Sequence, residues 1–88
     1  MPIQPMDIKE IKTQGFERVV HGYHEESNFS AYIAIHTLKN GPAFGGIRYW
    51  DYKDNERPYY DVQKLAEAMT EKCMVAGIHL SGGKTVIQ

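Results

Sequence analysis

Apolar and polar residues alternate most regularly over 31–36. Two isoleucines would share one face of a strand there, and Tyr32, Ala34 and His36 would share the other. The preceding segment 16–23 is rich in β-branched and aromatic residues, which also favour a strand. Because a short polar turn separates the two segments, the pattern predicts an antiparallel hairpin.

A recurrence of apolar residues at three- and four-residue spacing predicts a long helix over 59–76. Its expected inward face comprises Val62, Leu65, Ala66, Met69, Cys73 and Ala76. Pro58 suits the first turn of a helix, where the missing N–H is no loss. Gly77 is typical of the residue that follows a helix end.

The remaining pattern is weaker. It predicts a short helix over 8–12, a strand over 43–50 that a glycine pair interrupts, a loop over 78–83 and a last strand that opens at Lys84. Strands three and four would then be parallel, joined through the long helix by a right-handed crossover. The expected class is α/β, a mixed β-sheet with flanking helices.

Composition bounds the size and the environment of the protein. Its 88 residues make one small domain, and a net charge of −1 without a basic face argues against nucleic acid. The apolar runs are too short for a membrane span, and we expect no secretory signal because the first residues lack a basic segment followed by an apolar one. A single cysteine, Cys73, fits a reducing cytoplasm, and the four histidines show no metal-ligand spacing. Because the sequence stops inside an expected strand, we expect a fragment or a strand that pairs with an absent element.

Two lysines flank one short loop. Lys72 lies at the edge of the apolar helical face, and Lys84 follows the glycines at 82 and 83, which allow a close approach of the backbone to a ligand. A desolvated lysine beside a second cation can act as a base near neutral pH. The pair therefore indicates a site that binds an anion and transfers protons. The plainer alternatives are a solvated lysine at a strand start and a lysine that extends along the helix into water.

The same glycines invite a comparison with a phosphate-binding loop. That motif, G-x-x-x-x-G-K-[ST], requires a glycine at position 78, which is isoleucine here. It also places a helix after the loop, whereas this segment is expected to lead into a strand. Since no G-x-G-x-x-G is present either, a nucleotide-binding protein is the weakest interpretation.

Four motifs together resemble the N-terminal domain of the amino-acid dehydrogenases, the family of glutamate, leucine, phenylalanine and valine enzymes. They are IAIH at 33–36, GPAFGGIR at 41–48, MTEK at 69–72 and GGKTVI at 82–87. The resemblance covers about 15–88 and is closest to the leucine, phenylalanine and valine branch. It implies NAD-dependent oxidative deamination of an L-amino acid to a 2-oxo acid.

The resemblance also implies roles for single residues. The lysine that matches Lys72 binds the substrate carboxylate, and the one that matches Lys84 is catalytic, acting through water and an imino intermediate. Residues that match Met69 and Gly45 line the substrate pocket. Glutamate-specific members carry a lysine where this chain has Phe44, so an apolar substrate is expected here.

Three positions depart from the family pattern. Ser81 replaces a third glycine, Glu71 replaces a common tyrosine, and His79 is atypical. The family's catalytic aspartate and its dinucleotide-binding domain lie beyond residue 88. The resemblance therefore implies that NAD binds the full-length enzyme and no residue of this chain.

The combined expectation is the N-terminal substrate-binding and dimerisation domain of an amino-acid dehydrogenase for apolar substrates. It would occupy 15–88, incomplete at its C-terminal end, after an extension at 1–14. We expect a homo-oligomer that completes the reaction only with the missing cofactor domain. The alternative is a stand-alone, non-catalytic module that retains the family's assembly surface or binds an amino acid.

Overall fold

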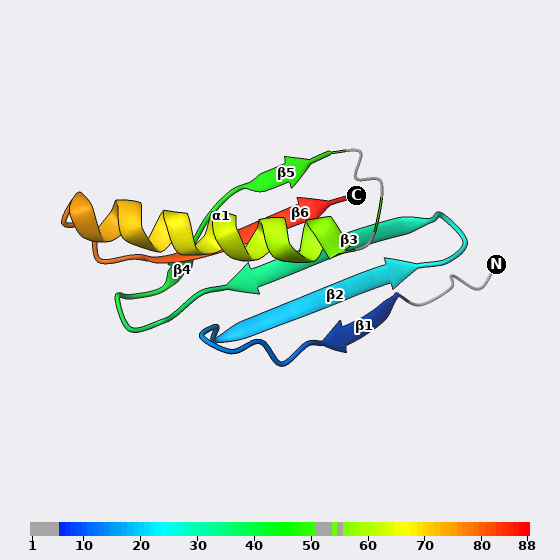
Figure 1. Ribbon diagram of the computed structural model, residues 1–88, viewed down its shortest axis with the longest axis horizontal. Coiled ribbons are helices and arrows are strands. Elements are labelled where there is room, and N and C mark those ends of the chain that lie inside the picture. Colours follow the sequence, from blue (N-terminus) through cyan, green and yellow to red (C-terminus); the bar gives the residue numbers. More distant parts are fainter. Residues whose placement is uncertain (1–5, 51–53, 55) are drawn as a thin grey trace.

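One helix crosses one face of a six-stranded sheet in the part of the chain that the structure, a computed structural model, describes (Figure 1). That part comprises residues 6–50, 54 and 56–88. The strands are β1 (Asp7–Glu10), β2 (Arg18–His24), β3 (Phe29–Ile35), β4 (Ala43–Phe44), β5 (Ile47–Tyr49) and β6 (Ser81–Ile87), and the helix is α1 (Glu56–Val75).

The sheet is mixed, as the sequence predicts. Strands β1, β2, β3 and β6 follow one another in antiparallel pairs, and β4 and β5 both pair with β6 in parallel. The predicted hairpin is β2–β3, and the chain returns through α1 to lay β6 between its two sets of neighbours (Figure 1). Strand β6 therefore pairs with β3, β4 and β5 in the sheet and also contacts the helix α1.

The core lies between α1 and the sheet. It is built from Val19, Tyr32, Ala34, Val62, Ala66 and Val86. The predicted alternation in β3 is confirmed, because Tyr32 and Ala34 point into this core while Ile33 on the opposite face is 45% exposed. Burial of apolar side chains on one face of each element supplies the main stabilisation.

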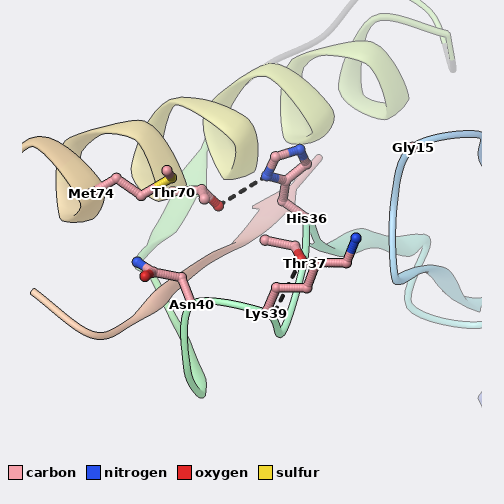
Figure 2. A pocket seen from close by; sticks show the side chains of 7 residues that line it. All are labelled: Gly15, His36, Thr37, Lys39, Asn40, Thr70 and Met74. Atoms are coloured by element: carbon pink, nitrogen blue, oxygen red, sulfur yellow. Dashed lines mark hydrogen bonds between the residues drawn. The ribbon is translucent and has the colours of Figure 1, made fainter.

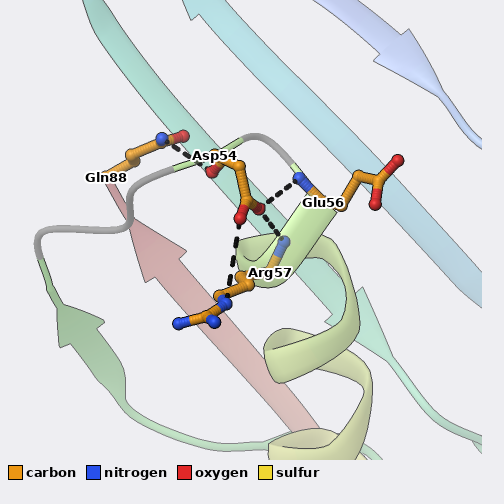
Figure 3. A network of polar contacts seen from close by, with 4 residues as sticks. All are labelled: Asp54, Glu56, Arg57 and Gln88. Atoms are coloured by element: carbon orange, nitrogen blue, oxygen red, sulfur yellow. Dashed lines mark hydrogen bonds and ion pairs between the residues drawn. The ribbon is translucent and has the colours of Figure 1, made fainter.

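The helix begins at Glu56, earlier than the sequence indicates, because Asp54 caps it. The Asp54 carboxylate accepts hydrogen bonds from the backbone N–H groups of Glu56 and Arg57, at 3.0 and 2.8 Å (Figure 3). Gln88 at the end of β6 donates from Nε2 to the Asp54 carbonyl at 3.1 Å. The start of α1 and the end of β6 are thus joined.

The far end of the helix corrects one expectation. Ala76 is exposed and does not belong to the inward face, because α1 ends at Val75 and Gly77 takes a positive φ of 71°. Thr70, which the apolar pattern leaves out, is buried instead. In the described residues no helix is long and apolar enough to cross a bilayer.

Two further expectations are wrong. The segment 8–12 is no helix: β1 pairs with β2 through its backbone, and so short a helix has little stability of its own. The last strand begins at Ser81 and not at Lys84, because Gly83 already pairs with Ile35 of β3. Gly82 and Gly83 thus lie inside strand β6, and not in a loop before it.

The His21 ring makes the stability of the fold depend on pH. It stacks on Tyr32 with ring centroids 4.3 Å apart, and its Nε2 is 2.8 Å from Ser30 Oγ. Burial first, and the Lys9 ammonium second, lower the pKa of His21 from 6.5. The folded state thus prefers the neutral ring, so protonation favours unfolding.

We predict that the free energy of unfolding decreases as pH falls from 6.5 towards the lower folded pKa of His21, and levels off below it. Urea unfolding of His21→Gln should show a shallower pH dependence over this window than the wild type. His79→Gln, an exposed loop variant, is the matched control and should keep the wild-type slope. Parallel curves for His21→Gln and the wild type would contradict the assignment.

Candidate functional site

The predicted site forms where α1, β6 and the segment between β4 and β5 meet. An added Cβ at Gly82 would overlap the Ala66 carbonyl oxygen of α1, and one at Gly45 would overlap the Gly83 carbonyl oxygen. These three backbones therefore lie in direct contact, which only glycine permits. The neighbour that requires Gly82 is thus the helix, whereas the sequence suggested a ligand.

A side-chain hydrogen bond fastens the same crossing. The backbone N–H of Gly82 donates to Thr70 Oγ1 at 2.7 Å, and this hydroxyl also shares a 3.0 Å hydrogen bond with His36 Nδ1 (Figure 2). Thr70 is 3% exposed, so the contact is shielded from water. This contact holds helix α1 and strand β6 in one relative position.

Lys84 points towards the helix side of the sheet, because residues two apart in a strand share a face and Gly82 meets α1. Its ammonium lies against Gly46, where an added Cβ would be 3.4 Å from Nζ. The side chain is partly buried. The flexible end of Lys84 therefore reaches the segment that joins β4 to β5.

Lys72 lies on the flank of α1 that faces β5. Asp61 stands about three helical turns earlier on the same flank, and its carboxylate pairs with Arg48 of β5 at 3.7 Å. Lys72 itself is exposed and borders a hollow of about 410 Å³ that is lined only by residues of α1 and by Ala76. Lys84 does not line this hollow, and its ammonium lies beside Gly46 instead.

The other predicted residues lie on α1, on β4 and in the segment that follows β4. Phe44 pairs with Gly82, so it lies on the sheet face that meets α1, and its side chain is 57% exposed. Met69 is partly buried, one helical turn before Cys73. Gly45 contacts β6 through its backbone, and Gly46 is the glycine that borders the Lys84 ammonium.

The three departures from the family pattern differ in their surroundings. Ser81 is fully buried, and its hydroxyl donates to the Gly41 carbonyl at 2.8 Å and accepts from the Asn40 N–H at 3.2 Å. It thus fixes the turn before β4 to the start of β6. Glu71 and His79 are exposed.

The sequence alone does not indicate two residues of the site, Thr70 and Gly46. Thr70 interrupts the apolar face of the helix, and a polar residue at such a position signals a buried hydrogen bond. Gly46 carries no separate signal beside Gly45. Its neighbour Lys84 lies far along the chain, and only the parallel pairing of β5 with β6 brings the two together.

The site matches neither a metal centre nor a phosphate loop. In the ranges that the structure describes, no group of three or more His, Cys, Asp and Glu side chains is placed to hold a metal ion. The segment Ser81–Ile87 is a strand, and the space above Gly82 is filled by α1, so its backbone cannot cradle a phosphate.

Comparison with known proteins identifies the family. The family described as "Glu/Leu/Phe/Val dehydrogenase, dimerisation domain" matches residues 13–88. The chain belongs to this family. The N-terminal dehydrogenase fold that the motifs indicate is thereby confirmed, with its mixed sheet and single described helix.

Its relatives are much longer. The chain is 44% identical to the leucine dehydrogenase of Geobacillus stearothermophilus over 80 residues, which are 91% of this chain and 22% of that protein. It is 42% identical to the phenylalanine dehydrogenase of Lysinibacillus sphaericus over 76 residues, 86% of this chain and 20% of that one. The crystal structure of L-tryptophan dehydrogenase from Nostoc punctiforme superposes with a TM-score of 0.77 at 37% identity, over 83% of this chain and 22% of that chain.

The two neighbouring glycines should respond differently to alanine. Gly45→Ala places a methyl group on the Gly83 backbone, which cannot yield, and should cost about 1–3 kcal/mol of stability. Gly46→Ala meets only the mobile end of Lys84, so the stability should stay near that of the wild type while the Lys84 ε-methylene resonance shifts. Urea unfolding and NMR check both results. Equal stability losses in the two variants would contradict this geometry.

Proposed function

We propose that this chain is the N-terminal substrate-binding segment of an NAD-dependent L-amino-acid dehydrogenase that acts on apolar substrates. The observation that carries the proposal is the placement of Lys84. Strand β6 holds it on the helix side of the sheet, with its ammonium against Gly46. It belongs to the GGKTVI motif, which resembles the family segment that carries the catalytic lysine.

Lys72 supports the binding half of the reaction. It stands on the flank of α1 that faces β5, and no carboxylate of the described residues forms an ion pair with it. An ammonium group in this position suits a substrate carboxylate, to which it offers a point charge and three donors. We assign it the role of carboxylate clamp.

Lys84 is proposed to transfer protons at the α-carbon. Oxidative deamination removes a hydride from the α-carbon and a proton from the amino group, which leaves an imino acid. Water then adds to the imine, and ammonium leaves as the 2-oxo acid forms. A lysine that accepts the proton of this water and returns it to the leaving nitrogen would speed both steps.

NAD supplies the acceptor for that hydride when it is bound. The glycines of β6 do not form a dinucleotide site, because α1 and Gly45 cover them. We therefore assign no cofactor contact to this chain and derive no step through NAD. The lysines act on the amino acid alone.

Phe44 favours an apolar substrate. The residue is exposed on the face of the sheet that carries Lys84, directly before the glycine segment. A phenyl ring offers no charge to a side-chain carboxylate, so glutamate would be left unpaired there. We propose a homo-oligomer as the working form, since the family's domain is a dimerisation domain.

The test is an assay of the protein at its natural length, following NADH with leucine, valine, phenylalanine and glutamate. We expect activity on the apolar substrates, a loss of about 10²–10⁴-fold in kcat for Lys84→Ala, and a raised KM for Lys72→Ala. Lys64→Ala, an exposed lysine on the same helix, is the matched control and should retain full activity.

Each alternative has its own result. Binding of an amino acid without turnover would favour the stand-alone module. Full activity in a folded Lys84→Ala protein would contradict the assigned role of Lys84, and activity confined to glutamate would contradict the role of Phe44.

A further inference from the structure

We propose that Thr70 is a positioning residue that sets the separation between Lys72 and Lys84. This inference rests on the proposed function, in which the two ammonium groups serve one substrate. Neither the motif resemblance nor the composition assigns Thr70 a role. Its evidence is the buried contact that it makes between the elements carrying the two lysines.

The hydrogen bond from Gly82 to Thr70 joins α1 and β6 at a point that lies two residues before each of the two lysines. Lys72 follows Thr70 by two residues on α1, and Lys84 follows Gly82 by two residues on β6. Since the donor–acceptor distance is 2.7 Å and Thr70 is 3% exposed, the two elements have little freedom to slide past each other here. The contact therefore fixes the relative position of the two backbone segments that carry Lys72 and Lys84.

His36 closes the contact into a triangle. Its backbone N–H donates to the Gly82 carbonyl at 2.9 Å, while its ring Nδ1 lies 3.0 Å from Thr70 Oγ1 (Figure 2). Thr70 belongs to α1, Gly82 to β6, and His36 is the residue that follows β3. Loss of the Thr70 hydroxyl would thus free both the strand and the imidazole from the helix.

The hydroxyl, and not the bulk of the side chain, is what the position requires. Valine has nearly the shape of threonine but no acceptor, so Thr70→Val leaves the Gly82 N–H buried without its partner. Thr70→Ser keeps the hydroxyl and removes only a methyl group. The two substitutions therefore separate the hydrogen bond from the packing.

The first measurement needs no substrate. A short cross-linker with two amine-reactive groups should join Lys72 to Lys84 in the wild type and in Thr70→Ser. Mass spectrometry of the digested chain measures the yield of this cross-link. We expect the yield to fall severalfold in Thr70→Val. Cys73→Ala, a buried change one turn further along α1 that leaves the hydrogen bond intact, is the matched control and should cross-link like the wild type.

The outcomes decide the inference. Equal yields in Thr70→Val and the wild type, or no cross-link in the wild type, would overturn it. Circular dichroism verifies that each variant is folded. If the valine variant is not, Thr70→Cys, whose thiol is a weak acceptor, should give an intermediate yield.

A second measurement separates this inference from the proposed function. Calorimetry with 4-methyl-2-oxopentanoate should show binding to the wild type and to Thr70→Ser, and about tenfold weaker binding to Thr70→Val, a difference of about 1.4 kcal/mol. No binding to the wild type, with the expected cross-linking pattern, would refute the proposed function and leave the positioning intact. Equal affinities with a reduced cross-link in Thr70→Val would overturn the claim that the spacing serves the substrate.

Discussion

Helix α1 and strand β6 meet backbone to backbone at Gly82, and the rest of the molecule is arranged around that contact. A side chain at position 82 would collide with the Ala66 carbonyl, and one at position 45 with the Gly83 carbonyl. Close packing of this kind tolerates no added methyl group without displacement of a whole element. Because positions 82 and 45 are glycines, the backbone of β6 can contact both the backbone of α1 and that of the segment between β4 and β5.

This constraint determines where the chemistry can occur. With the backbones in contact, the side chains at the edges of the crossing carry the chemistry: the partly buried Lys84 extends towards Gly46, and Lys72 is exposed on the flank of the helix that also carries Asp61. The Gly82 N–H donates to Thr70 Oγ1 and the Ser81 hydroxyl donates to the Gly41 carbonyl, so two neighbouring residues of β6 are held in place. The flexible Lys84 side chain therefore extends from a rigid strand. Rigid support is what a proton-transferring group needs to act on a bound substrate.

Local pattern predicts the elements well and their contacts poorly. The alternation over 31–36 identifies the face that Tyr32 and Ala34 bury, and the helical spacing identifies Val62 and Ala66. A glycine pair signals a close approach but does not say which element approaches, so the sequence does not indicate α1 as the neighbour of Gly82. The sequence does not indicate the edge strand β1 for a related reason: its pairing with β2 outweighs the weak helical preference of residues 8–12.

The most direct test of the account is hydrogen exchange at the Gly82 amide, followed by NMR on the 88-residue chain. Its N–H donates to a buried side-chain oxygen at the helix–strand crossing. We predict that this amide exchanges as slowly as the β3 amides at the centre of the sheet, and only through global unfolding. Exchange as fast as at an exposed turn residue such as Gly15 would show that helix and strand are not joined there, and would contradict it.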